Sequence, residues 1–154
     1  MAVRPFRSDD ASTLVNIWYE AVKATHFFLT QQDIDFYYDQ VRDIYLPQLD
    51  VWVYEDNGII KGFIGFSQED SNHKIEMLFV DPNFHGQRIG SSLITWAKRR
   101  IKGSILVDVN EENPAAHFFY LKKGFEFIGR SELDSSGQPF PIIHLLYQKK
   151  IKAK

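Results

Sequence analysis

The sequence contains no cysteine, which excludes disulfide bonds, thiolate metal ligands and a cysteine nucleophile. It has no run of the roughly 18 to 20 consecutive apolar residues that a membrane-spanning helix needs. It also has no excess of positive charge, because 18 Lys and Arg face 20 Asp and Glu and give a formal net charge of −2. The chain therefore has no overall basic field for nucleic acid or an anionic membrane, and we expect neither partner.

What is present is the composition of an ordinary folded domain. The 154 residues are 44% hydrophobic, 25% charged and 15% aromatic, which is enough apolar material for a sizeable core. We expect one domain over residues 1–154, because no repeat or linker interrupts the sequence. The N-terminal residues lead directly into mixed polar sequence and do not resemble a signal peptide, so we expect a cytoplasmic protein.

Apolar periodicity predicts elements in the order β-α-α-β-β-β-α-β-α-β-β. The predicted strands cover residues 2–7, 51–54, 59–66, 74–80, 104–109, 125–129 and 142–147, and the predicted helices cover residues 8–23, 30–46, 88–101 and 113–123. Ser8 and Thr30 are the expected N-caps of the first two helices, and Pro47 is expected to end the second. The pair Asn57-Gly58 predicts a hairpin turn. This order predicts an α/β fold with a mixed, mostly antiparallel sheet flanked by helices.

A loop of small and polar residues follows the strand at 74–80 and opens the next helix. Small residues let backbone N–H groups approach a ligand, and a helix N-terminus adds unpaired amides and a positive dipole end. We interpret the loop as a cradle for a pyrophosphate, and its candidate residues are His85, Gly86, Gln87, Arg88, Gly90 and Ser91. In the alternative interpretation the glycines serve only a tight turn and close packing.

The helix at 113–123 has a second candidate surface. Asn113, Ala116 and Tyr120 are spaced i, i+3, i+7 and share one helix face, so an amide, a small residue and a phenol lie in a row. A ligand could lie against the small residue. The alternatives are that Asn113 is an N-cap and that Tyr120 is a core aromatic.

These two segments together resemble the signatures of the GCN5-related N-acetyltransferase (GNAT) family. The helix matches the family motif Asn-x-x-Ala-x-x-Phe-Tyr-x-x-x-Gly-Phe at every fixed position, with Asn113, Ala116, Phe119, Tyr120, Gly124 and Phe125. The loop resembles the family's pyrophosphate loop, written (Gln/Arg)-x-x-Gly-x-(Gly/Ala). There His85 replaces the usual Arg or Gln, Arg88 replaces the usual Gly, and Gly90 fits.

The resemblance implies a fold, a co-substrate and a mechanism. The implied fold is the acyl-CoA N-acyltransferase (GNAT) fold, the co-substrate is acetyl-CoA, and no metal is implied. The backbone of Leu78, Phe79 and Val80 would pair with the pantetheine arm of CoA, and Asn113 would hydrogen-bond to it. Tyr120 would donate a proton to the departing CoA thiolate. The absence of cysteine adds that no acyl-thiol intermediate can form on the protein, so an amine must attack the thioester directly.

An attacking amine must lose a proton, and Glu76 is the candidate base. It lies two residues before Leu78 and on a regular strand would share its face, although a surface ion pair is the alternative. Candidate residues on the acceptor side are His26, Phe28 and His144. The alternative for His26 is a helix C-terminal histidine, and for His144 a hydrogen-bonded structural histidine. The segments around His26 and residues 129–134 also resemble a bacterial branch of the family whose acceptors are poorly defined.

The sequence thus predicts an acetyl-CoA-dependent N-acetyltransferase. The acceptor would be a small-molecule amine, or a lysine or N-terminus of a peptide or protein. The alternative function is a non-catalytic acyl-CoA-binding protein. The sequence does not fix the oligomeric state, and a homodimer is one option.

Overall fold

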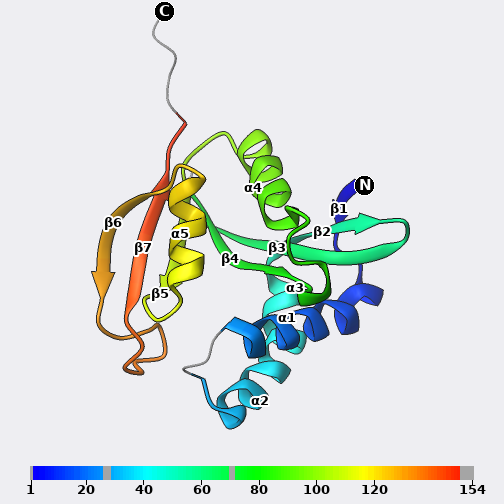
Figure 1. The fold of residues 1–154 in the computed structure, drawn as a ribbon, viewed down its shortest axis with the longest axis horizontal. Coiled ribbons are helices and arrows are strands. Elements are labelled where there is room, and N and C mark those ends of the chain that lie inside the picture. Colours follow the sequence, from blue (N-terminus) through cyan, green and yellow to red (C-terminus); the bar gives the residue numbers. More distant parts are fainter. Residues whose placement is uncertain (1, 26–28, 70–71, 150–154) are drawn as a thin grey trace, which may run out of the picture.

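The computed structural model describes residues 2–25, 29–69 and 72–149. In chain order its elements are β1 (Ala2–Pro5), α1 (Ala11–Thr25), α2 (Gln31–Gln40), α3 (Leu46–Gln48), β2 (Asp50–Asp56), β3 (Ile59–Glu69), β4 (Asn72–Val80), α4 (Ile89–Arg100), β5 (Ile105–Asn110), α5 (Pro114–Lys122), β6 (Glu126–Ser131) and β7 (Ile142–Tyr147) (Figure 1). The predicted order is confirmed, and the ends of the elements differ from the prediction by a few residues.

The strands form one sheet in the order β1-β2-β3-β4-β5-β7-β6. All neighbours are antiparallel except β4 and β5, which are parallel. The prediction of a mixed, mostly antiparallel sheet flanked by helices is therefore confirmed. The single parallel pair joins strands that α4 separates in the sequence, as a strand-helix-strand connection requires.

The core has two parts, one on each face of the sheet. The first lies under α4 and α5, and the second lies under α1 and α2. In β3, Phe63 and Ile64 are both 0% exposed, and one belongs to each part. Successive side chains of a strand point to opposite faces, so a strand buried on both faces reads as a continuous apolar run.

Two local predictions are confirmed. The Thr30 hydroxyl accepts the Asp33 N–H at 3.1 Å and so caps α2. Asn57 and Gly58 have φ angles of 52° and 78°, which a two-residue hairpin turn needs.

Two other local predictions are wrong. Ser8 does not cap the first helix, because the chain enters α1 through a 3-10 turn whose N-cap residue is Arg7. Pro47 does not end the second helix, because α2 continues into a π-helical turn, Val41–Tyr45, and then into α3. Pro47 lies in the first turn of α3, where a missing N–H is tolerated.

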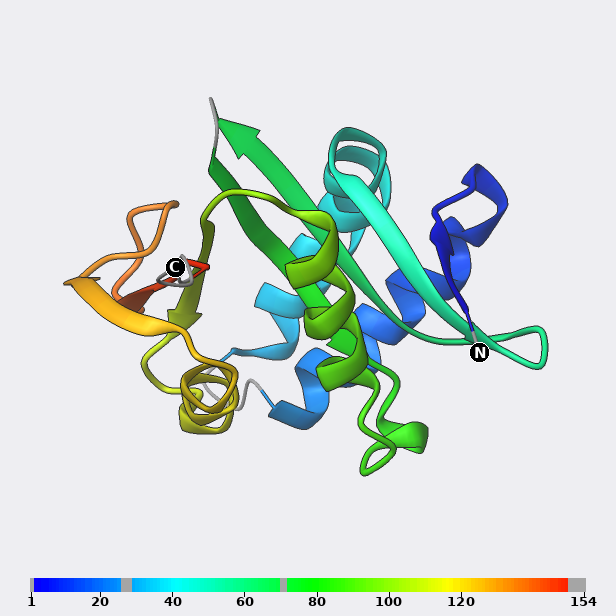
Figure 2. The same cartoon turned by 90° about the horizontal axis from the view of Figure 1, so that it is seen from above.

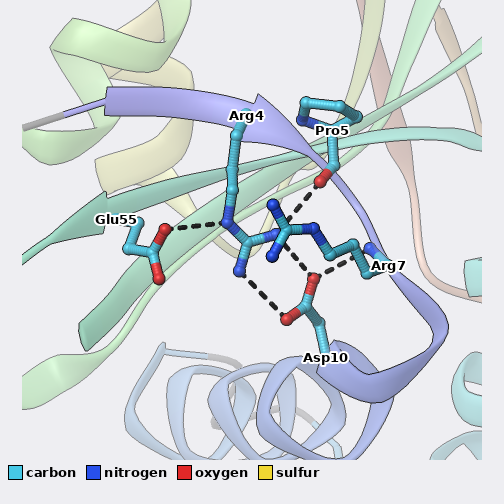
Figure 3. Close-up of polar contacts among 5 residues, drawn as sticks. All are labelled: Arg4, Pro5, Arg7, Asp10 and Glu55. Carbon is cyan, nitrogen blue, oxygen red and sulfur yellow. Dashed lines mark hydrogen bonds and ion pairs between the residues drawn. The ribbon is translucent and has the colours of Figure 1, made fainter. Parts of the chain in front are cut away.

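A charged cluster fixes the N-terminal strand to the rest of the fold (Figure 3). Arg4 on β1 donates to both carboxylate oxygens of Asp10, at 2.9 and 3.1 Å. It also donates to Glu55 on β2 at 2.8 Å. The Asp10 carboxylate accepts the Arg7 N–H as well, at 2.8 Å. Asp10 is only 8% exposed, so this network compensates for its burial.

Candidate active site

The strands β4 and β5 diverge part-way along their length (Figures 1 and 2). Their pairing covers three positions, from His73 opposite Ile105 to Ile75 opposite Val107. Beyond these positions β4 continues to Val80 and β5 to Asn110. On the edge toward β5, backbone groups of β4 from Leu78 to Val80 therefore face an opening, while their other edge pairs with β3. Backbone N–H and C=O groups at such an opening can pair with an extended ligand.

Two adjoining pockets fill this opening. A pocket of about 110 Å³ lies between the diverging strands, and another of about 270 Å³ lies between β4, α4 and α5. Both are lined by Leu78, Phe79, Asn113, Ala116 and Tyr120. The structure thus brings together the two segments that the sequence singled out.

The larger of these pockets reaches the loop before α4. Val80, His85 and Gly90 line it as well, so six of the residues expected to bind the co-substrate lie around one space. Gly86, Gln87, Arg88 and Ser91 lie in the same loop and in the first turn of α4.

The backbone conformation of Arg88 shows why the family pattern usually has a glycine at this position. Arg88 is the residue before α4 and has a φ of 59° and a ψ of 29°, in the left-handed region. Glycine adopts this conformation without strain, and glycine is what the family pattern has there. The turn is thus kept although the residue type differs, and a guanidinium is added beside the helix N-terminus.

Gly90 lines the pocket and lies next to Phe119 of α5. A Cβ atom there would lie 3.4 Å from Phe119 Cζ, which is an ordinary van der Waals contact. Close packing of α4 on α5 therefore does not by itself require a glycine at this position, and the small residue leaves space in the pocket.

Asn113 is the N-cap of α5. Its Oδ1 accepts the Ala116 N–H at 3.3 Å, which confirms the alternative interpretation of this residue. The cap uses the side-chain oxygen, so the amide NH2 group is the part of Asn113 with which it would donate to a ligand.

Tyr120 is 6% exposed and packs edge-on against Phe119 and Phe125, with 5.2 Å between ring centroids in each pair. It is a core aromatic, as the alternative interpretation has it, and it also lines both pockets. Burial raises the pKa of the Tyr120 phenol. The phenol therefore stays protonated near neutral pH, which a proton donor requires.

The prediction that Glu76 shares the face of Leu78 is wrong, because β4 is not a regular strand at this point. The pairing of β3 with β4 shifts at this point, since Gly65 pairs with Met77 and Phe66 with Ile75. Glu76 is the extra residue of a β-bulge, which re-aims side chains. Its carboxylate accepts the Ser67 hydroxyl at 2.9 Å and lines a pocket with Met77.

That third pocket has a volume of about 490 Å³ and lies on the α1 and α2 side of the sheet. Its lining includes Trp18 of α1, Tyr37 of α2 and Ser135 from the connection between β6 and β7. Glu76 and Phe79 line both this pocket and the one between the strands, so the two spaces adjoin at the bulge.

His144 lies on β7, and its ring is held from both sides. Its Nδ1 lies 2.6 Å from Asp108 Oδ1, and its Nε2 lies 2.7 Å from the Ser131 hydroxyl. The hydrogen-bonded alternative for His144 is therefore confirmed. His26 and Phe28 lie outside the described residues, so their predicted place on the acceptor side stays a prediction.

Asp108 is a site residue that the sequence reasoning missed. It lines the pocket between the strands, and its Oδ2 lies 2.8 Å from the Lys74 ammonium. Partial desolvation acts to raise the pKa of Asp108, but hydrogen bonds from Lys74 and His144 outweigh it and lower the pKa. The available signal was a charged residue within the predicted apolar strand at 104–109.

The described ranges contain neither a cluster of metal-ligating side chains nor a membrane-spanning helix. No group of three or more His, Asp or Glu side chains there could hold a metal ion. No helix there is both long and apolar enough to cross a membrane.

Comparison with known proteins identifies the family. Residues 47–127 match the family model described as an acetyltransferase (GNAT) domain. The chain is 36% identical to the peptidyl-lysine N-acetyltransferase YjaB of Salmonella typhimurium over 146 residues, which cover 94% of this chain and 97% of that protein.

Solved structures agree with this result. The solution structure of apo YjaB from Escherichia coli has a TM-score of 0.83 and 34% identity, and the match covers 95% of this chain and 96% of that chain. The PaiA N-acetyltransferase from Thermoplasma acidophilum, in complex with coenzyme A, has a TM-score of 0.77 at 17% identity, with coverage of 96% and 100%; at this identity it supports the fold alone. With the family motif of α5 intact and the diverging strands in place, the chain belongs to the GNAT family of acetyltransferases.

Proposed function

We propose that this protein transfers an acetyl group from acetyl-CoA to a primary amine, and that the amine is the side chain of a peptidyl lysine. The observation that carries the proposal is the opening between β4 and β5, where Leu78, Asn113 and Tyr120 surround one space. The YjaB relatives, which are named peptidyl-lysine N-acetyltransferases, support the acceptor class. Residues 1–154 would form one N-acetyltransferase domain.

The residues around the pocket between β4, α4 and α5 fit the co-substrate. The unpaired edge of β4 from Leu78 to Val80 offers backbone groups to a pantetheine arm. The amides of the loop and of the first turn of α4 would donate to the pyrophosphate, with the dipole of a 12-residue helix behind them. His85 and Arg88 add donors next to this cradle. Acetyl-CoA, when bound, supplies the activated thioester.

Two side chains of the protein would carry out the proton transfers of the reaction. Glu76, directly or through a water molecule, would take the proton of the acceptor ammonium and make the amine nucleophilic. The amine then attacks the thioester carbonyl, the nitrogen releases its second proton to solvent, and the C–S bond breaks to leave the amide and the CoA thiolate. Tyr120 would give its proton to the departing thiolate and later recover one from solvent. The absence of cysteine supports direct attack in a complex that holds both substrates.

The Tyr120→Phe variant tests this mechanism. It removes one hydroxyl and keeps the edge-on ring packing, so kcat should fall by roughly 10²–10⁴. The affinity for CoA, measured by isothermal titration calorimetry, should stay within about twofold, since the ring keeps its contacts. Activity is measured as CoA thiol release with a lysine peptide.

The matched control is Tyr54→Phe, a half-buried tyrosine on β2, which should behave as the wild type. An unchanged kcat in Tyr120→Phe would remove the proton-donor role. CoA binding without thiol release in the wild type would favour an acyl-CoA-binding protein instead.

A further inference from the structure

A row of polar side chains crosses the sheet from β6 to β4. The Ser131 hydroxyl contacts His144 Nε2 at 2.7 Å, and His144 Nδ1 contacts Asp108 Oδ1 at 2.6 Å. The other oxygen of Asp108 lies 2.8 Å from Lys74 Nζ, and this ammonium lies 3.8 Å from Glu76 Oε1. The row thus ends at the carboxylate proposed as the base.

The row lies on the acceptor side of the sheet. In β5, Val107 and Val109 belong to the core part under α4 and α5, so Asp108 between them points to the opposite face. The same alternation in β7, around Ile143 and Leu145, places His144 on that face. This is the side on which α1 and α2 cover the third pocket.

Asp108 is held in one charge state and one orientation. Its Oδ1 lies 2.6 Å from His144 Nδ1, and His144 Nε2 lies 2.7 Å from the Ser131 hydroxyl, so both ring nitrogens are engaged and the imidazole is fixed in orientation. The pKa of Asp108 is lowered, so the carboxylate is ionised near neutral pH. One third of its side chain is exposed, at 33%, so a ligand can reach it.

The group bound by Asp108, the ammonium of Lys74, indicates what kind of ligand this carboxylate can bind. Lys74 Nζ is the ammonium of a lysine side chain, which is the chemical group that the proposed function assigns to the acceptor. Lys74 is 37% exposed, and its long side chain can leave Asp108 without movement of the backbone of β4. A second ammonium entering the pocket between the strands would meet the same carboxylate.

We propose that Asp108 binds the ammonium of the acceptor amine before acetyl transfer, with His144 and Ser131 as positioning residues and Lys74 as an internal competitor. This assignment rests on the proposed function and adds the residue that selects the acceptor. Because the recognition is between opposite charges, the favoured acceptors are alkylammonium groups such as the lysine side chain. Aromatic amines, which are uncharged near neutral pH, would gain nothing from Asp108.

The test compares steady-state kinetics of Asp108→Asn and Lys74→Met with a peptide that contains one lysine. In Asp108→Asn the KM for the peptide should rise by about tenfold or more, the effect of losing one charge-assisted hydrogen bond, while the KM for acetyl-CoA stays within about twofold. In Lys74→Met the KM for the peptide should fall several-fold, because a competing ammonium is removed. The double variant should have the KM of Asp108→Asn alone.

Matched controls remove the same charges elsewhere. Asp9→Asn and Lys102→Met change exposed residues away from the row, and both should keep the wild-type KM for the peptide. His144→Ala should raise this KM less than Asp108→Asn does. In His144→Asn the KM for the peptide should lie between the values of His144→Ala and the wild type, because the asparagine amide can donate to Asp108.

The peptide KM should rise in Asp108→Asn and fall in Lys74→Met, and this difference in direction separates acceptor binding by Asp108 from a purely structural role. If Lys74→Met raises the peptide KM as Asp108→Asn does, the row only stabilises the sheet and the proposal is wrong. An unchanged peptide KM in Asp108→Asn would also overturn it. If the wild type acetylates no lysine peptide, the proposed function itself fails, and this assignment fails with it.

Discussion

The Asp10→Asn substitution tests how strongly the N-terminal charged cluster holds the fold together (Figure 3). The change keeps the shape of the side chain and removes its charge. It breaks the paired contact with Arg4, in which the two distances are 2.9 and 3.1 Å. The contact with the Arg7 N–H can persist, because an amide oxygen also accepts a hydrogen bond.

The magnitude follows from the burial of both partners. The side chains of Arg4 and Asp10 are 15% and 11% exposed, so solvent screens their attraction only weakly. Removing one partner of a buried ion pair costs about 3–5 kcal/mol. Here Glu55 remains 2.8 Å from Arg4 and partly compensates its charge, so we expect a loss of about 2–3 kcal/mol in the free energy of unfolding.

The same pair makes stability depend on pH. The hydrogen bond from Arg4 lowers the pKa of Asp10, opposed by burial and assisted by the Arg7 N–H. A carboxyl whose pKa is lower in the folded state stabilises the protein above its unfolded pKa of about 3.9. This contribution is lost as the pH falls through the folded-state pKa. The wild type and Asp10→Asn should therefore differ fully at neutral pH and converge in acid.

Urea denaturation followed by tryptophan fluorescence, at pH 7 and at several values below 4, measures both effects. Asp9→Asn, at the exposed neighbouring position, is the control and should change little. A loss below about 1 kcal/mol at pH 7 would refute the argument from burial. A difference between wild type and Asp10→Asn that persists unchanged in acid would refute the argument from the pKa.

Two further predictions concern the loop before α4. Arg88→Gly should raise the free energy of unfolding by roughly 0.5–1 kcal/mol in urea denaturation, because a non-glycine residue at a φ of 59° is strained; a lower stability would contradict this reasoning. Gly90→Val should abolish CoA binding by calorimetry while circular dichroism shows a folded protein. Gly90 lines the pocket, and a Cβ atom there would contact Phe119 Cζ at 3.4 Å, so the methyl groups beyond it would enter the pocket. Wild-type affinity in Gly90→Val would mean that the pocket does not hold CoA.

Local signals predicted the element order and brought out the residues that line the pocket proposed for the co-substrate. The pattern from Asn113 to Phe125 lies on one helix, and the Asn57-Gly58 turn involves two adjacent residues, so sequence spacing suffices for both. The face of Glu76 could not be predicted, because it depends on a shift in pairing with β3 that period-two alternation does not reveal.

The proposed acceptor side depends on contacts between distant parts of the chain. Asp108 and His144 are 36 residues apart and meet only because β5 and β7 pair in one particular register. The third pocket joins α1, α2 and the connection between β6 and β7. No short motif encodes such an arrangement, and sequence reasoning therefore named His144 without its partner.

The divergence of β4 from β5 after three paired positions has a consequence for how new acceptors could be selected in evolution. The entrance proposed for the thioester is located where two backbones part, which many side-chain substitutions elsewhere leave unchanged. Helices α1 and α2 and the β6–β7 connection can then accumulate substitutions that alter the choice of amine, while the chemistry shared by all acceptors is inherited unchanged.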